Sequence, residues 1–148
     1  ARRVLDKAVE RSLRRAALWD EVKDRVHDSA LGLSGGQQQR VAIARTLAQE
    51  PEVILADEPV ASLDPASSQR VLRILKQICD TKNIPVIINL HQVDLAQQYA
   101  DRIIGIQDGR LVFDGRSDDF SLDIARTIYG SQYESAVCIP DSKQIEAA

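Results

Sequence analysis

Two carboxylates and a histidine follow apolar segments of this sequence, and they are the side chains best suited to chemistry. Asp57 and Glu58 end the run 53–59, Val-Ile-Leu-Ala-Asp-Glu-Pro, and His91 follows the apolar run 86–90. Neighbouring side chains on a strand point in opposite directions, so we expect the two acids to have different tasks. One could hold Mg²⁺, and the other could orient or deprotonate an attacking water. The heptapeptide alone is equally compatible with an exposed acidic turn beside a proline.

A second candidate group is Ser34-Gly35-Gly36, at the start of an expected helix. Glycines leave the backbone N–H groups there uncovered, and the positive end of the helix dipole favours an anion. The alternative is an ordinary serine N-cap after a flexible loop. For these three residues alone, that alternative is the simpler interpretation.

Helices and short apolar strands must position these groups. Hydrophobic periodicity and capping signals predict helices over residues 3–18, 36–49, 66–80, 93–100 and 118–130. Strands are predicted at 53–56, 86–90, 102–107 and 110–113, the last two joined at Asp108-Gly109 as a hairpin. The expected apolar stripes of the first three helices are Leu5, Val9, Leu13 and Ala17; Val41, Ala44, Leu47 and Ala48; and Val71, Leu72, Leu75, Ile78 and Cys79.

The strands at 53–56 and 86–90 do not alternate polar and apolar residues. Such runs, separated by helices, predict parallel strands covered on both faces, and therefore an α/β fold. Ligands of such sheets lie beyond the carboxyl ends of the strands. We therefore expect Asp57, Glu58 and His91 to meet at one site.

Composition narrows the class of protein. The 148 residues suffice for one domain with a sizeable core, and the net charge of −3 gives no general reason to expect nucleic acid. No stretch approaches the roughly 20 apolar residues that span a bilayer, so we expect a soluble chain that reaches any membrane through another subunit. Cys79 and Cys138 suit no metal pattern, and Cys79 is expected to be a buried reduced thiol.

Four motifs resemble those of the ATP-binding-cassette (ABC) transporter ATPases. Leu33 to Arg40 is similar to the family's signature motif, and Val53 to Pro59 to its Walker B strand with the following glutamate. Ser62-Leu63-Asp64 resembles the D-loop, and His91 matches the switch histidine. The motifs occur in the family's order at plausible spacings. The resemblance implies an α/β, P-loop NTPase-like ABC ATPase domain, present in part.

The resemblance also implies roles and cofactors at the strand ends. ATP and Mg²⁺ would be bound, with Asp57 holding Mg²⁺ through water. Glu58 would polarise the hydrolytic water. His91 would contact the γ-phosphate and sense its loss.

Other residues would serve a nucleotide held by a second, head-to-tail ATPase subunit. Ser34, Gly35 and Gly36 would contact its γ-phosphate in trans. Gln37 would lie near its ribose or phosphates. Asp64 would line the dimer interface and couple the two sites. Further partners implied are transmembrane permease subunits and, indirectly, a solute-binding protein, which places the subunit in the cytoplasm on the inner face of the membrane.

The resemblance implies three regions. They are a portion of the helical subdomain with the signature motif (1–50), a catalytic core (51–115), and a C-terminal helix and tail (116–148). No G-x-x-x-x-G-K-[ST] occurs in the 148 residues. We therefore expect the C-terminal part of a cassette, inactive alone and poorly soluble or partly folded.

The transported solute is a finer question. Residues 54–65 and 90–96 resemble the ATPase of bacterial phosphonate importers, whereas 18–23 and 29–32 resemble that of phosphate importers. The longer similarity favours phosphonate. Two alternatives are a soluble cassette ATPase that acts on DNA or ribosomes, and a non-enzymatic module that only binds partners. The chain has neither heptads nor a repeat to favour the soluble cassette.

Overall fold

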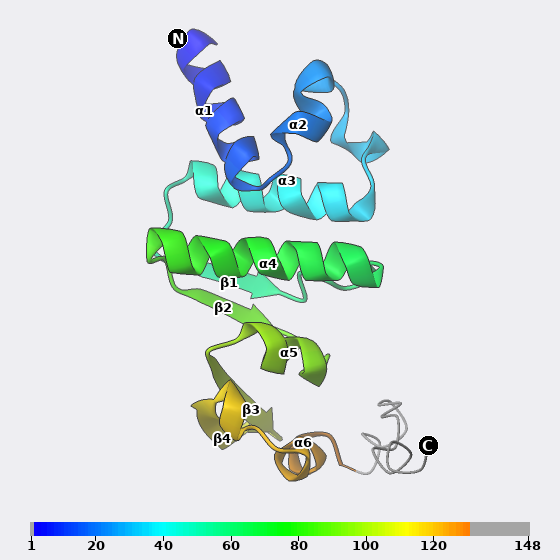
Figure 1. Ribbon diagram of the computed structural model, residues 1–148, viewed down its shortest axis with the longest axis vertical. Helices are drawn as coiled ribbons and strands as arrows, with labels where there is room; N and C mark the ends of the chain where they lie inside the picture. The colour runs from blue at the N-terminus through cyan, green and yellow to red at the C-terminus, as the bar shows by residue number, and fades with distance from the viewer. Residues whose placement is uncertain (1, 131–148) are drawn as a thin grey trace, which may run out of the picture. The chain divides into compact units, whose positions relative to one another are not determined.

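The computed structural model describes residues 2–130 (Figure 1). The chain divides into two compact units, Ala1–Leu95 and Ala96–Ala148. The predicted division at residues 50 and 115 stays a prediction. Cys138 and the predicted tail lie outside the described residues.

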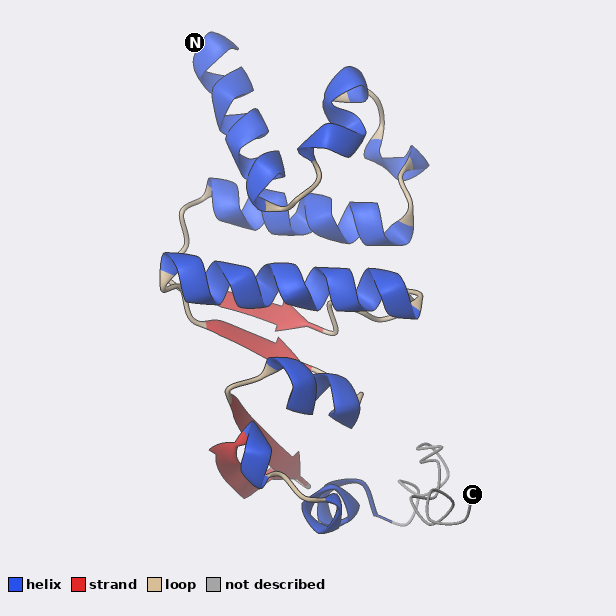
Figure 2. Ribbon diagram, in the orientation of Figure 1, coloured by secondary structure: helices blue, strands red, loops and turns tan. Residues whose placement is uncertain are grey.

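The first unit contains helices and a two-stranded sheet (Figure 2). In chain order its elements are α1 (Arg2–Arg15), α2 (Trp19–Val22), the 3₁₀ turns η1 (Lys23–Arg25) and η2 (Ala30–Gly32), α3 (Gly35–Ala48), β1 (Ile54–Asp57), α4 (Pro65–Lys82) and β2 (Val86–Asn89). Helix α5 (Val93–Tyr99) follows and crosses the boundary between the units. Each predicted helix and strand of this unit is present, with ends shifted by a few residues.

The sheet of the first unit is parallel, as predicted. Strand β1 pairs with β2 so that Ile54 lies opposite Val86 and Asp57 lies opposite Asn89. Helix α4 lies over one face of the sheet (Figure 1). The expectation that both faces are covered is wrong for the described residues, because Leu55 and Ile87, paired in register, are 73% and 61% exposed. One covering helix buries one face only, since successive side chains of a strand point to opposite faces.

The predicted stripe of the first helix is only partly buried. Leu13 is buried, but Leu5 and Val9 are 65% and 44% exposed. Both line an apolar hollow of about 660 Å³ between α1 and α3. Helix α1 ends at Arg15, and Ala17 is exposed with a left-handed φ of 49°, so Ala16 is the alanine buried in its place.

Helix α4 follows its predicted pattern more closely than α3 does. Val71, Leu72, Leu75 and Ile78 are buried, and Cys79 is a half-buried free thiol. In α3, Ala44 and Leu47 are buried as predicted, whereas Val41 is half-buried and Ala48 is exposed. The buried face of α3 is completed by Gly36, Arg40 and Ile43.

The second unit is a β-hairpin with a short helix. Strands β3 (Arg102–Gln107) and β4 (Arg110–Arg116) are antiparallel and confirm the predicted hairpin. Asp108 and Gly109 both have positive φ, 48° and 74°, as a type I′ turn requires. The predicted helix over 118–130 is shorter, because buried Phe120 is extended after the 3₁₀ turn η3 (Ser117–Asp119), and Ser121 then caps α6 (Leu122–Tyr129).

Candidate functional site

The carboxyl ends of β1 and β2 bring four polar residues together, named here the acid–histidine cluster: Asp57, Glu58, Asn89 and His91. His91 Nε2 lies 2.7 Å from Glu58 Oε1, and Asn89 Nδ2 donates to Asp57 Oδ1 at 2.9 Å. The Glu58 backbone N–H also donates to the Asn89 carbonyl. The predicted meeting of Asp57, Glu58 and His91 at one edge of the sheet is therefore confirmed.

The backbone after β1 holds Glu58 in an uncommon conformation. Glu58 and Ser62 have positive φ, 45° and 61°, in the left-handed region that non-glycine residues seldom adopt. The turn between them is anchored by Val60, which is 2% exposed and whose carbonyl accepts from the Leu63 N–H. Strained backbone of this kind persists where the surroundings fix it, and it is frequent at functional sites.

Asp57 fits the requirements of a magnesium ligand. Its carboxylate is exposed, and the bond from Asn89 fixes Oδ1. Mg²⁺ is usually bound by one or two carboxylates together with waters and substrate phosphates, rather than by a cage of protein ligands. Within residues 2–130, no group of three or more His, Cys, Asp or Glu is arranged to hold a metal. Asn89 was not predicted, although its register opposite Asp57 in a parallel pair would have placed it.

The start of α3 presents the second predicted group. Ser34 is the N-cap, as predicted: its Oγ accepts from the Gln37 N–H at 3.3 Å, and Gln37 Oε1 accepts from the Ser34 N–H at 3.0 Å. A hydroxyl that accepts in this way keeps its own proton to donate. The N–H groups of Gly35 and Gly36 stand at the helix end, where the helix itself supplies no acceptor. An anion can therefore be bound here.

Gly36 and Ser67 bring the starts of α3 and α4 into close contact. A Cβ on Gly36 would lie 2.9 Å from Ser67 Oγ, closer than real side chains tolerate. Asp64 caps α4 by accepting from the Ser67 N–H at 3.0 Å. Hydrogen bonding to Ser67 lowers the pKa of Asp64, so the cap is ionised at neutral pH. Gly36 is thus required by packing as well as by any role toward a ligand.

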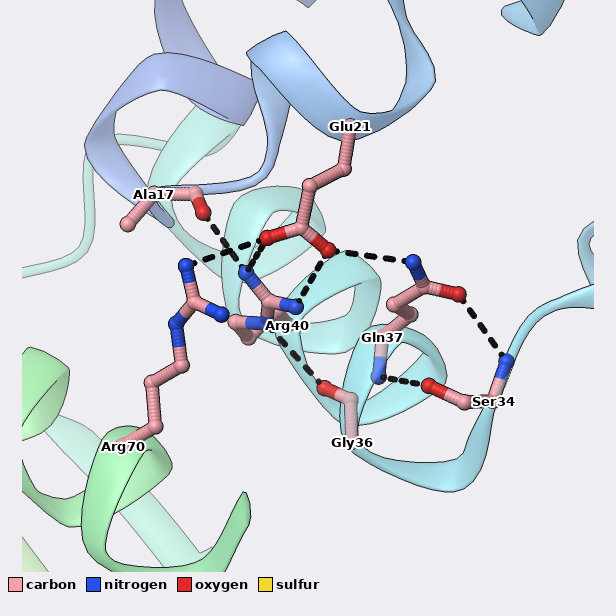
Figure 3. Close-up of polar contacts among 7 residues, drawn as sticks. All are labelled: Ala17, Glu21, Ser34, Gly36, Gln37, Arg40 and Arg70. Carbon is pink, nitrogen blue, oxygen red and sulfur yellow. Dashed lines mark hydrogen bonds and ion pairs between the residues drawn. The ribbon is translucent and has the colours of Figure 1, made fainter. Parts of the chain in front are cut away.

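A network of charged side chains near the start of α3 was missed by the sequence-based prediction (Figure 3). Glu21 of α2 forms two 2.8 Å bonds with Arg40 of α3, whose side chain is 5% exposed. Gln37 and Arg70 also reach Glu21, at 3.0 and 3.1 Å. A signal was present: Arg40 lies in register with the apolar residues Ile43 and Leu47 of α3, and a buried arginine requires a partner.

These contacts set the charge of Glu21. The bonds from Arg40, with smaller contributions from Gln37 and Arg70, lower the pKa of Glu21 from 4.5 to about 2. A folded-state pKa below the unfolded value means that ionised Glu21 stabilises the fold above about pH 4.5 and that this stabilisation is lost as the pH falls towards 2. We expect a carboxyl ¹³C NMR titration to show Glu21 ionised down to about pH 3. An Arg40→Gln variant should return its pKa towards 4.5. A midpoint near 4.5 in the unsubstituted protein would contradict this arrangement.

The predicted residues lie in two separate groups. Within residues 2–130, no hydrogen bond or ion pair joins Ser34, Gly35 or Gly36 to the acid–histidine cluster. Residues 58–64 connect Glu58 along the chain to Asp64, the N-cap of α4. The first turn of α4 in turn contacts the first turn of α3 through Ser67 and Gly36. The roles of these residues stay predictions.

Comparison with known proteins defines the class. Residues 3–61 match the ABC transporter family model. The ATP-binding cassette MJ0796, solved as a dimer in a post-hydrolysis state bound to ADP and Pi, superposes with a TM-score of 0.63 and 33% identity over 77% of this chain and 47% of its own. CbiO1 from Clostridium perfringens, part of the ABC transporter complex CbiONQ, superposes with a TM-score of 0.71 and 31% identity, covering 80% and 46% of the two chains. Residues 3–61 thus belong to the ABC transporter family, and the two solved cassettes extend the likeness to about four fifths of the chain.

Among curated relatives the similarity is to phosphonate importers. The phosphonates import ATP-binding protein PhnC of Thiobacillus denitrificans is 60% identical over 106 residues, which cover 72% of this chain and 41% of that protein. The PhnC of Halobacterium salinarum is 43% identical over 138 residues, covering 93% and 48%. The chain therefore spans less than half the length of these relatives. None of the helices described within residues 2–130 is long and apolar enough to cross a bilayer.

Proposed function

We propose that this chain supplies the signature motif and the hydrolytic carboxylate of an ATP-driven motor subunit of an ABC importer for phosphonate. The observation that carries the proposal is the 2.7 Å contact of His91 with Glu58 beside Asp57 at one strand edge. The phosphonate part rests on the names of the relatives, since the solute does not touch this subunit. Phosphate is the second choice of solute.

Each member of the acid–histidine cluster has a task in this proposal. Asp57, fixed by Asn89, holds Mg²⁺, which offsets the charge of the nucleotide phosphates. Glu58 orients the attacking water and accepts its proton. His91 steadies the Glu58 carboxylate through the described contact and, after ATP binds, contacts the γ-phosphate. Phosphoryl transfer depends mainly on such positioning and on electrostatic stabilisation.

The start of α3 serves a nucleotide of a second subunit. Ser34 donates its hydroxyl, and the N–H groups of Gly35 and Gly36 point to the γ-phosphate held by the partner subunit. The Gln37 side chain is already bonded to Ser34 and Glu21, so we assign it to shaping this helix end rather than to a direct ribose contact. Asp64 couples the two sites by fixing the start of α4 against α3. Permease subunits would hold the dimer at the cytoplasmic face of the membrane.

The test uses a chimeric cassette, in which this chain replaces the aligned part of the Thiobacillus denitrificans relative. We expect the chimeric cassette to hydrolyse ATP with Mg²⁺ and to form an ATP-dependent dimer. Its control is the 148-residue chain alone, which contains no phosphate-binding loop motif and should show no hydrolysis above background. Steady-state phosphate release measures hydrolysis, and gel filtration with and without ATP measures dimerisation. A folded chimeric cassette that binds ATP without turning it over would contradict the proposal.

A further inference from the structure

Three side chains from two other helices converge on the Glu21 carboxylate (Figure 3). It lies in α2, a single helical turn, whereas Gln37 and Arg40 belong to α3 and Arg70 to α4. One carboxylate therefore joins three elements that are far apart in sequence. None of the roles assigned above includes it.

The Arg40 branch fixes Glu21 firmly. The Arg40 guanidinium bonds both Glu21 oxygens at 2.8 Å and also donates to the Ala17 carbonyl at 2.6 Å and the Gly36 carbonyl at 3.3 Å. Paired, parallel bonds between a guanidinium and a carboxylate add geometric specificity as well as energy. Because Arg40 is almost fully buried, it has few other arrangements open to it. Glu21 is thereby placed accurately against the first turns of α3.

Gln37 links the Glu21 carboxylate to Ser34. Gln37 Nε2 donates to Glu21 Oε2 at 3.0 Å, and Gln37 Oε1 accepts from the Ser34 N–H at 3.0 Å. The carboxylate thus sets which way the amide points, since only its NH₂ group can donate. With the amide so oriented, its oxygen is available to the Ser34 backbone. The geometry of the signature serine depends on Glu21 through one intermediate side chain.

Arg70 links the Glu21 carboxylate to α4. Arg70 Nη2 lies 3.1 Å from Glu21 Oε1, and its side chain is 55% exposed. A hollow of about 140 Å³, lined by Ser34, Gly36, Arg40, Ala66, Ser67 and Arg70, separates the first turns of α3 and α4 beyond the Gly36–Ser67 contact. The ion pair joins α4 to α2, and because Glu21 is also bonded to Arg40 of α3, α4 and α3 are linked through α2 where their direct packing is interrupted. It therefore restricts how Asp64 and Ser34 move relative to each other.

We propose that Glu21 is a positioning residue for the trans nucleotide site, holding Ser34 of the signature and Asp64 of the D-loop in one fixed arrangement through Gln37 and Arg70. The inference rests on the proposed function. It assigns Glu21 no contact with nucleotide. Its effect is confined to steps in which the signature of one subunit meets the ATP of the other.

The experiment compares Glu21→Gln, Arg70→Gln and Arg70→Lys in the chimeric cassette. For Glu21→Gln we expect kcat to fall about 10–100-fold, since small displacements at a reacting site have effects of this size. ATP-dependent dimerisation should weaken in parallel, while the affinity of the monomer for ATP stays within about twofold, because Glu21 does not serve the nucleotide of its own subunit. Glu10→Gln is the matched control: it removes a carboxylate from the exposed Glu10–Arg14 pair of α1 and should change nothing.

Arg70 keeps the inference testable if Glu21→Gln fails to fold, since an exposed arginine can be replaced without burying an unpaired charge. Arg70→Gln should lower kcat in the same pattern but less, and Arg70→Lys should restore most of it. The double variant Glu21→Gln/Arg70→Gln should be no worse than Glu21→Gln, because both act through one contact. Wild-type kcat in both single variants, or additive losses in the double, would overturn the inference. Failure of the unsubstituted chimeric cassette to hydrolyse ATP would instead overturn the proposed function.

Discussion

Replacing Glu58 with glutamine is expected to lower ATP turnover by the chimeric cassette about 10²–10⁴-fold, the usual cost of losing a positioned general base. Glutamine keeps the size of the side chain and a hydrogen-bonding oxygen toward His91, so the edge of the sheet should stay intact. The affinity for ATP should remain, because the substitution removes a proton acceptor and not a phosphate contact. Single-turnover phosphate release and equilibrium nucleotide binding separate the two effects.

A further consequence is accumulation of product-free, ATP-bound dimer, since the step that ends this state is blocked. Gel filtration with Mg²⁺–ATP would detect it. Glu52→Gln is the matched control, because Glu52 is an exposed glutamate two residues before β1. Turnover within about twofold of the unsubstituted chimeric cassette would remove Glu58 from the chemical step.

The second large effect is expected at the start of α3. Ser34→Arg should abolish ATP-driven dimerisation and turnover of the chimeric cassette, because a bulky side chain would fill the space where the partner's phosphate meets the helix end. Binding of ATP to the monomer should be nearly unchanged. Isothermal titration calorimetry on the monomer measures ATP binding, and light scattering with ATP measures dimerisation.

Loss of the helix cap must be separated from this effect. Ser34→Ala removes the hydroxyl without adding bulk, and loss of such a cap usually costs about 1 kcal/mol of stability. Ser29→Arg is the matched control, because Ser29 is also an exposed N-cap, of η2, whose Oγ accepts from the Leu31 N–H. A collapse of monomer affinity for ATP in Ser34→Arg would show that this serine serves its own subunit's nucleotide.

Local signals predicted the elements well. Signals that act within a few residues can be recognised in the sequence. Examples are Pro51 and Pro85, the Ser34 cap and the Asp108-Gly109 turn. The parallel pairing of β1 and β2 followed from their apolar character, and it placed Asp57 and His91 at one edge. Those parts of the site that depend on strand ends were therefore predictable.

Contacts between distant segments were not predictable in the same way. Glu21 lies in a single helical turn with no period of its own, and its partners Arg40 and Arg70 follow 19 and 49 positions later. The partial burial of α1 has a similar cause, because Leu5 and Val9 carry the right periodicity but lie over a hollow instead of a neighbouring side-chain layer. Periodicity indicates which face can be buried, and the tertiary neighbours decide whether it is.

The contact between Gly36 and Ser67 gives α3 a pivot close to its first turn. From there α3 runs without a break to Ala48. At about 1.5 Å per residue the far end of the helix lies about 18 Å from this contact, so a rotation of about 5° around it would carry that end through about 1.6 Å. Arg45 and Ala48 border the apolar hollow beneath α1, so the same rotation would change the width of that hollow. The two ends of α3 therefore differ in their surroundings, since the first turn is in close contact with α4 and the last turn borders an apolar hollow.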